Sequence, residues 1–172
     1  FLVLLFETSV SNSEESKIKI GVLAPLSGEN ATLGKQILNS IRMALIDIKN
    51  NNIEIYPKDT KSDPDVTLRS ALELERMGIS LVIGPVFHKN LLFLDNVKSI
   101  TFLSLTNKTL NLHKNIISSG INSSSQLNTI KKFLEKSEIK KTIFLIPNLN
   151  YDLEIKKGIK ESKIKFLKQY NY

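Results

Sequence analysis

Apolar and polar residues follow one another along the chain with two different periods. Residues 17–25 first alternate and then become continuously apolar, which is typical of a strand that enters a covered parallel sheet. Residues 31–50 carry apolar side chains at spacings of three and four, which predicts an amphipathic helix that the asparagines at 50–52 end. Its apolar stripe, expected to face the core, consists of Leu33, Ile37, Ile41, Ala44, Leu45 and Ile48.

The same two periods recur through the rest of the chain. They predict strands at 53–57, 79–84, 100–105, 142–147 and 164–170. They predict helices at 63–78, 91–97, 124–140 and 151–162. In the first of these helices, Pro64 fits the first turn and Gly78 fits the C-terminal cap. In the helix at 124–140 we expect the inward side chains to be Leu127, Ile130, Phe133 and Leu134.

Strands that are separated by helices predict the α/β class, with right-handed crossovers and a doubly wound parallel sheet. Residues 106–123 interrupt this order because they are polar and rich in Asn and Ser, and we expect a hinge between two lobes there. Residues 1–16 hold a short apolar run and then a polar stretch. The run is shorter than the roughly 20 apolar residues of a membrane span, so we interpret 1–16 as a leader, the remnant of a secretory signal.

The carboxyl ends of the predicted strands indicate where a ligand would bind, because ligands of open parallel sheets bind outside those ends. Four loops follow strands there, at 26–30, 85–90, 106–109 and 148–151. Their polar and aromatic side chains suit the orientation of a small ligand. These candidate ligand-binding residues are Ser27, Asn30, Phe87, His88, Thr106, Asn107, Lys108 and Tyr151. For each of them, an ordinary role in a turn or a cap is the alternative.

Several chemistries lack their residues in this sequence. The chain has no Cys, which excludes disulfides, zinc–thiolate sites and Cys nucleophiles, and it has only 2 His. Residues 28–35 are close to a phosphate-binding loop, but five residues separate Gly28 from Gly34, and Gln36 follows Lys35 in place of a hydroxyl residue. We therefore reject an NTPase. Neither a dinucleotide fingerprint nor a nucleophile elbow is present either.

Three aspartates cluster after the second predicted strand, at Asp59, Asp63 and Asp65. They lack the glycine bend and the regularly spaced ligands of a calcium loop. Negative charge at the start of the helix at 63–78 is favourable through the helix dipole, which is the interpretation we prefer. The sequence thus predicts a protein that is not an enzyme, with no cofactor and no metal. An α/β enzyme with dispersed catalytic residues, such as His88 and Asp59, is the alternative from another class.

Positive charge is concentrated near the C-terminus. The chain has a formal net charge of +7, and residues 131–172, with 11 Lys and 5 acidic residues, account for +6 of it. Lys outnumbers Arg by 21 to 3, and a bias towards Lys, Ile and Asn is what an AT-rich genome gives. Nucleic-acid surfaces more often interleave Arg and aromatic residues with Lys. We therefore interpret the lysines as a solvated face and expect no nucleic-acid partner.

Several stretches together resemble the type I periplasmic binding protein superfamily, the Leu/Ile/Val-binding-protein-like proteins. They are KIKIGVLAPLSGENATLG, the long helix after it, IYPKDTKSDPDVTLRSALEL, GISLVIGPVF, FLSLTN and IFLIPNLNYD. The resemblance implies a two-lobed periplasmic-binding-protein type I fold, with lobe 1 at 17–117 and lobe 2 at 118–172. It also implies that the second lobe is incomplete and that the chain is the N-terminal part of a longer protein, with apolar surface exposed where the rest would pack.

Within this superfamily, LAPLSGENATLG, PKDT and VIGPVF are most similar to the penicillin-binding protein activators. That resemblance implies a periplasmic protein, in the activators an outer-membrane lipoprotein, that binds a peptidoglycan synthase and stimulates it. The alternative is the substrate-binding protein of an ABC importer for branched-chain amino acids or similar small polar solutes. Its partner would be the importer permease.

The importer receptors of this superfamily hold an amino-acid ligand with the loops after the third and fourth strands and with a Tyr of the second lobe. Carried over by position, these are 87–89, 106–108 and Tyr151. Phe87 and His88 stand where the receptors carry a serine-containing turn. Because this bulky pair would crowd a ligand carboxylate, the departure weakens the transport hypothesis and is compatible with a lobe that contacts a protein.

Overall fold

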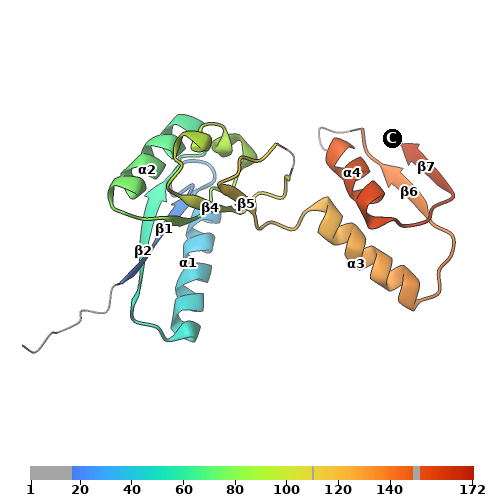
Figure 1. Ribbon diagram of the computed structural model, residues 1–172, viewed down its shortest axis with the longest axis horizontal. Helices are drawn as coiled ribbons and strands as arrows, with labels where there is room; N and C mark the ends of the chain where they lie inside the picture. The colour runs from blue at the N-terminus through green and yellow to red at the C-terminus, as the bar shows by residue number, and fades with distance from the viewer. Residues whose placement is uncertain (1–16, 110, 149–151) are drawn as a thin grey trace, which may run out of the picture.

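The computed structural model describes residues 17–109, 111–148 and 152–172, which form two bodies joined by one connecting segment (Figure 1). The first body holds a five-stranded sheet in the order β2-β1-β3-β4-β5, and the second holds a two-stranded sheet of β6 and β7. The strands of the first body are β1 Ile18–Ala24, β2 Ile53–Asp59, β3 Leu81–Ile83, β4 Thr101–Ser104 and β5 Ile116–Ser118. Its helices are α1 Ala31–Ile48 and α2 Pro64–Arg76. The second body contains α3 Ser123–Lys136, β6 Ile143–Ile146, α4 Asp152–Ser162 and β7 Lys168–Asn171.

All the strand pairs are parallel, which confirms the predicted α/β class with a parallel sheet. β2 lies on one side of β1 and β3 on the other, so the chain reverses its direction across the sheet after β2. Right-handed crossovers then place α1 and α2 on opposite faces, which is the doubly wound arrangement. Figure 1 shows α2 and α1 on the two sides of β1 and β2.

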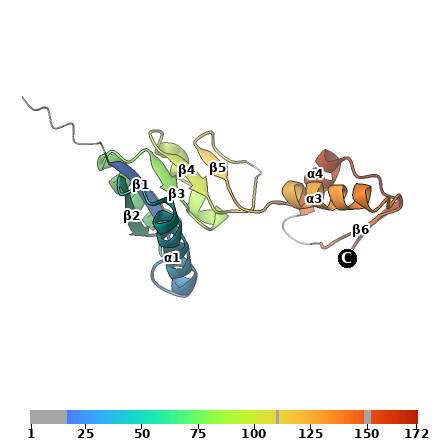
Figure 2. The ribbon, with the colours of Figure 1, turned by 90° about the horizontal axis from the view of Figure 1, so that it is seen from below.

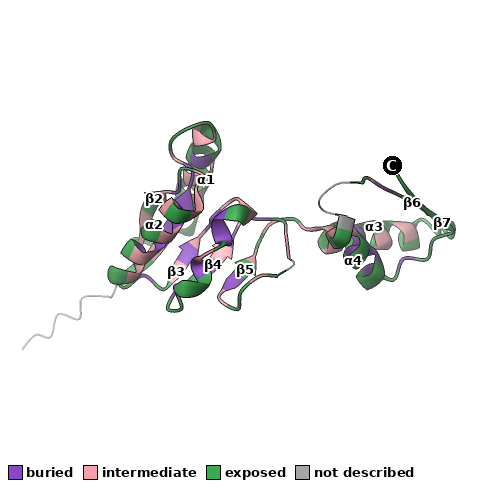
Figure 3. Cartoon of the chain, turned by 90° about the horizontal axis from the view of Figure 1, so that it is seen from above, coloured by how far each residue is buried: buried purple, intermediate pink, exposed green. Residues whose placement is uncertain are grey.

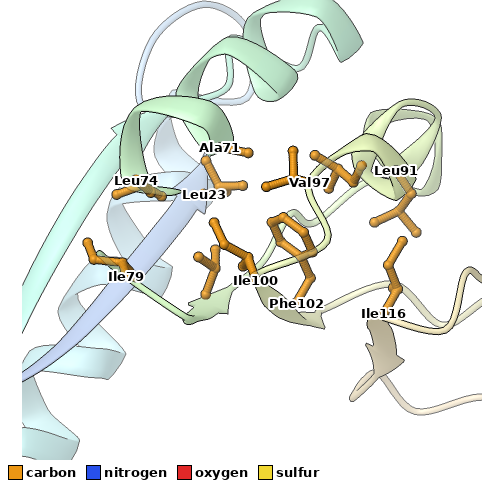
Figure 4. Packing of buried hydrophobic residues seen from close by; sticks show 11 residues of the cluster. Leu23, Ala71, Leu74, Ile79, Leu91, Val97, Ile100, Phe102 and Ile116 are labelled. Atoms are coloured by element: carbon orange, nitrogen blue, oxygen red, sulfur yellow. The ribbon is translucent and has the colours of Figure 1, made fainter. Parts of the chain in front are cut away.

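The core of the first body lies between α2, the segment before β4 and one face of the sheet. Ala71 and Leu74 of α2 pack there with Leu23, Val82 and Phe102 of the strands, all at 1% exposure or less (Figure 4). Truncating a buried Phe or Leu typically costs a few kcal/mol of stability. The packing on this face therefore fixes the strands, and with them the loops at their carboxyl ends.

The segment before β4 differs from the helix predicted at 91–97. It forms two 3₁₀ turns, η1 His88–Leu91 and η2 Leu94–Asn96. Leu91, Leu94 and Val97 are all buried and stand three residues apart, which is the period of a 3₁₀ helix and not of an α-helix. The apolar spacing predicts a helix, and the structure corrects its type, because a period of three is that of the 3₁₀ helix.

The apolar stripe of α1 is another difference from the prediction. Gly34 is the one buried residue of this helix, while Leu33 is 37% exposed and Ile48 is 58% exposed. α1 meets the sheet beside β1 and then runs away from it (Figure 2). Periodicity shows which side chains share a face, but it does not show what covers that face. The helix itself is confirmed.

The second body packs α3 and α4 together against one face of its two strands. Leu127, Ile146, Ile159 and Ile164 form its buried cluster. Gly158 allows the helices to approach, because a Cβ there would lie 2.9 Å from Leu127 Cδ1. Leu127 and Leu134 point inward as predicted, but Ile130 and Phe133 are 45% and 61% exposed because no described element covers that side of α3 (Figure 3).

The ends of α2 follow the sequence signals. Pro64 occupies the first turn, and Asp63 is the N-cap, whose side chain accepts a hydrogen bond from Val66 N. Gly78 has φ +73° after the last turn, and Ile79 N donates to Leu74 O at 3.1 Å. Within the residues that the structure describes, no helix is long and apolar enough to cross a membrane.

Candidate functional site

The carboxyl ends of β1 and β3 meet where the strand order reverses. In sheets of this order, ligands bind in the crevice at that point. Gly84, directly after β3, has φ +101°, and a Cβ there would lie 2.2 Å from Leu23 O of β1. Only glycine permits this backbone conformation and this close approach. The glycine thereby holds the loop after β3 beside the end of β1.

A hollow of about 530 Å³ opens between the loop after β3 and the segment between β4 and α3. It brings together five of the eight predicted site residues, Phe87, His88, Thr106, Asn107 and Lys108. The remaining lining comes from Val86, Lys89, Leu105, Gly120 and Ile121. The sequence analysis does not select Gly120 and Ile121, because it predicts no strand at 116–118 and interprets 106–123 as a hinge.

Hydrogen bonds to Thr106 hold the loop after β4 in its conformation. Thr106 is 4% exposed, and its Oγ1 accepts a hydrogen bond from Lys108 N at 3.2 Å. Its carbonyl oxygen accepts from Ser118 Oγ at 2.7 Å and from Gly120 N at 3.2 Å. Thr106 therefore holds the loop in shape, and its hydroxyl is mostly committed within the protein.

The loops after β3 and β4 are joined by Ser104, a buried residue that sequence reasoning did not select. Ser104 Oγ donates to Pro85 O at 2.9 Å and accepts from Thr106 N at 3.3 Å. Leu105 N also donates to Pro85 O, at 3.0 Å. A serine that ends a strand is a frequent turn signal, but its partner on another strand lies beyond what local sequence shows.

The hollow carries positive charge on its walls. Lys89 and Lys108 line it, His88 adds an imidazole ring, and none of the described lining residues is acidic. The half-buried Phe87 adds an aromatic surface beside His88. Opposite charges attract, so this lining favours an anionic group over a cation.

Ser27 and Asn30 are not part of the hollow; both are tied to the loop after β2. Ser27 Oγ donates to Asp59 Oδ2 at 2.5 Å, and Asn30 Nδ2 donates to Ser62 Oγ at 3.1 Å. The loop after β2 was left out of the predicted site, although the carboxyl-end rule applies to that strand as well. Applied to β2 as well, the rule places Asp59, named above only in the aspartate cluster and in the enzyme alternative, at the same edge of the sheet as Ser27.

The pKa of Asp59 lies below its ordinary value. Partial burial acts to raise this pKa, but hydrogen bonds from Ser27 Oγ and from the N–H groups of Lys61, Leu26 and Ser27 together lower it by more. The carboxyl group is therefore held in its charged, accepting form. No group of three or more His, Cys, Asp or Glu able to hold a metal ion occurs within the described part of the chain.

The two bodies contact each other beside Asn107. Thr109 N of the first body donates to Glu154 Oε1 of α4 at 2.7 Å, while Ser123 Oγ donates to Glu154 O at 2.9 Å within the second body. A cavity of about 160 Å³ lies at this junction and is lined by Asn107, Ile121, Ser123, Gln126, Glu154 and Ile155. Tyr151, the predicted aromatic of the second lobe, lies outside the described residues.

A family model described as periplasmic binding protein matches residues 17–163. The chain belongs to the periplasmic binding protein family, and its fold is the type I fold of that family.

Three known proteins illustrate the similarity. The LpoA (YraM) C-domain of Haemophilus influenzae, described as a regulator of PBP1A, matches with a TM-score of 0.72 at 18% identity, over 90% of this chain and 50% of that one. A branched-chain amino acid ABC transporter ligand-binding protein of Burkholderia xenovorans matches with a TM-score of 0.66 at 16% identity, over 91% of this chain and 46% of that one.

A curated relative, the uncharacterized protein MJ1266 of Methanocaldococcus jannaschii, is 31% identical over 87 residues, which are 46% of this chain and 21% of the relative. The chain thus spans about half of those two solved structures and about a fifth of the archaeal relative. At these identities the solved structures establish the fold.

Proposed function

We propose that the chain is a non-enzymatic binding module of the periplasm that regulates peptidoglycan synthesis by contacting a synthase, in the manner of the penicillin-binding protein activators. The observation that carries this proposal is the character of the hollow beside β3 and β4. Phe87 and His88 fill the position of a ligand-binding turn, and the Thr106 hydroxyl accepts a bond from the loop itself. These departures from the receptors disfavour their amino-acid site and favour a protein contact.

The same surface suits a protein partner. Aromatic residues are enriched at protein interfaces, and Phe87 is followed directly by His88 and Lys89. With Lys108 on the opposite wall, the hollow would receive an acidic or carboxylate-bearing surface. The fold match to a PBP1A regulator is consistent with this partner class.

The proposal is tested by measuring retention of the chain on an immobilised peptidoglycan synthase from the same organism. Phe87→Ala and Lys108→Ala are each expected to weaken binding about tenfold, which corresponds to about 1.4 kcal/mol. Lys98→Ala, an exposed lysine between η2 and β4, is the matched control and is expected to bind normally. Absence of binding by the unaltered chain would contradict the proposal.

The second candidate function is the substrate-binding protein of an ABC importer for branched-chain amino acids or similar small polar solutes, with the importer permease as partner. The observation in its favour is the hollow itself, whose lysines and backbone groups stand where a ligand carboxylate would bind. A solute at 100 times its dissociation constant adds roughly 2.7 kcal/mol of stability, which a thermal-shift screen detects. Under this hypothesis Thr106→Ala and Tyr151→Ala each weaken the shift, whereas a synthase regulator gives none.

The proposal also includes a division of the chain into two lobes and a location in the periplasm. We propose that residues 17–117 form lobe 1 and residues 118–172 the start of lobe 2. The first sheet ends with β5 at Ser118 and α3 begins at Ser123, which supports a boundary in this short interval. An outer-membrane lipid anchor, as in the activators, is the finer hypothesis on location. The proposed leader at 1–16 lies outside the described residues.

A further inference from the structure

One carboxylate joins the loops that follow β1 and β2. Asp59 Oδ1 accepts hydrogen bonds from Leu26 N at 2.8 Å, from Ser27 N at 3.3 Å and from Lys61 N at 2.9 Å. Asp59 Oδ2 accepts from Ser27 Oγ at 2.5 Å. The next peptide adds a further tie, because Thr60 N donates to Ala24 O at 2.9 Å. The loop at 26–30 is therefore attached to the sheet through the end of β2.

These bonds determine what Ser27 offers to its surroundings. An ionised carboxylate only accepts, so the Ser27 hydroxyl hydrogen must point to Asp59. The lone pairs of Ser27 Oγ remain, and Ser27 is exposed beside the end of β1, where the strand order reverses. A group that meets Ser27 from solvent therefore encounters an acceptor, with a negative charge directly behind it.

We propose that Asp59 is a positioning residue that fixes the loop at 26–30 and orients Ser27 to accept a hydrogen bond from an N–H donor such as a primary ammonium. The binding role rests on the proposed function and deepens it, because it names the chemistry of one contact of the ligand or partner. The orientation of the loop is independent of that function. A purely local capping role for Asp59 would explain the bond from Lys61 N, two residues away, but not the three from Leu26 and Ser27 across the sheet.

The hydrogen-bond partners of Asp59 come from three elements. They are the loop after β1, the loop after β2 and Ser70 of α2, whose Oγ donates to Asp59 O at 3.3 Å. Among these partners Lys61 is the one charged residue, and it contributes its backbone N–H. The accepting state of Asp59 is thus set mainly by neutral donors, so removing the carboxylate leaves no buried cation behind.

The positioning role is tested by amide hydrogen exchange, followed by NMR on the whole chain. In Asp59→Ala we expect the amides of Leu26, Ser27 and Lys61 to exchange at least tenfold faster, while Val82 in the centre of the sheet keeps its protection. Asp47→Asn, on the exposed side of α1, removes the same charge and is expected to change none of these rates. Unchanged exchange at Leu26 and Ser27 in Asp59→Ala would overturn the proposal.

A pH titration of the unaltered chain covers the case in which Asp59→Ala does not fold. The Leu26 and Ser27 amide shifts are expected to follow one titration curve together with the Asp59 carboxyl carbon. Amide shifts that are independent of the Asp59 titration would overturn the positioning role.

The acceptor role of Ser27 is tested with two cations of equal charge. Methylammonium, which has N–H donors, is expected to shift the Ser27 and Asp59 resonances, and tetramethylammonium, which has none, is not. Ser27→Ala is expected to abolish the difference.

A lysine-containing peptide that gives the same shifts would indicate a protein ligand, and free amino acids that give them would indicate a solute. Equal responses to the two cations would overturn the acceptor role. Neither test uses a synthase, so failed synthase binding would contradict the proposed function alone.

Discussion

Two glycines with positive φ differ in what surrounds them. Gly84 has φ +101° and an added Cβ would lie 2.2 Å from Leu23 O, whereas Gly28 has φ +75° and nothing within 4 Å. We expect Gly28→Ala to cost about 1–2 kcal/mol for its backbone conformation alone. Gly84→Ala is expected to cost at least about 2 kcal/mol more, because β1 and β3 must also separate. Urea unfolding of both variants measures the difference, and equal costs would show that the strand ends are not in close contact.

The Asp59 carboxyl makes stability depend on pH. Burial opposes its ionisation, but hydrogen bonds led by that of Ser27 prevail and hold its pKa below the ordinary value. A group whose pKa is lower in the folded state stabilises the fold above its unfolded pKa, and this contribution is lost as the pH falls through the folded pKa. We therefore expect the free energy of unfolding to fall on acidification below about pH 4.

The contribution of Asp59 to that fall is isolated by comparing variants in urea at neutral and acidic pH. Asp59→Asn is expected to show a smaller fall than the unaltered chain, because it has no carboxyl to protonate. Asp47→Asn, on the exposed side of α1, is expected to keep the full fall. An identical pH dependence in Asp59→Asn would mean that other carboxylates, such as Glu54 or Glu73, carry the effect.

At the scale of elements, the start of α2 depends on one cap. Asp63 Oδ1 accepts from Val66 N at 2.8 Å, with Asp63 in an extended conformation. Asp63→Ala is expected to lower the stability of the first body by about 1 kcal/mol, since a free N–H then lacks its partner. Asp63→Asn keeps an acceptor and is expected to lose only a few tenths. Thermal unfolding followed by circular dichroism checks both, and equal losses would favour the charge over the cap.

The elements that the sequence predicted well are those whose signals are local. β1 has seven residues with a strand pattern, and α2 carries Pro64 and Gly78 at its two ends. β5 was missed because its three residues, Ile116–Ser118, stand in a polar segment and pair only with β4. The apolar stripe of α1 was expected to face the core because its period shows that these side chains share one face. Periodicity does not show which element, if any, packs against that face.

The candidate site was likewise predictable where its signals are local. The rule for carboxyl strand ends located the loops around Phe87 and Thr106, and the structure brings them to one hollow. Ser27 lies outside the hollow, bound to Asp59. The sequence does not predict this partner because Asp59 is 32 residues away. Such long-range hydrogen bonds are decided by register between strands, and no local pattern encodes them.

At the scale of the whole molecule, one carboxylate of α4 connects the two bodies. Glu154 Oε1 accepts from Thr109 N of the first body at 2.7 Å, whereas the bond from Ser123 Oγ to Glu154 O joins α3 to α4 within the second body. Because the loop at 106–109 also lines the candidate site, this contact joins the hollow to the second body. Where two domains close around a ligand, the contacts between them affect the opening. We therefore expect the Thr109–Glu154 contact to influence how freely the hollow opens.

We expect Glu154→Ala to loosen the joint without unfolding either body. The side-chain bond to Thr109 N is lost, and the bond from Ser123 Oγ to the Glu154 carbonyl, which joins α3 to α4 inside the second body, remains. Limited proteolysis at 119–122 is then expected to be several-fold faster, since local opening sets the rate of cleavage when reclosing is fast. Glu161→Ala is the matched control, because Glu161 lies on the same helix and accepts from Ser124 Oγ within the second body. If both variants are cleaved at the same rate, the Thr109–Glu154 contact does not hold the bodies together, and the loop at 106–109 shapes the hollow on its own.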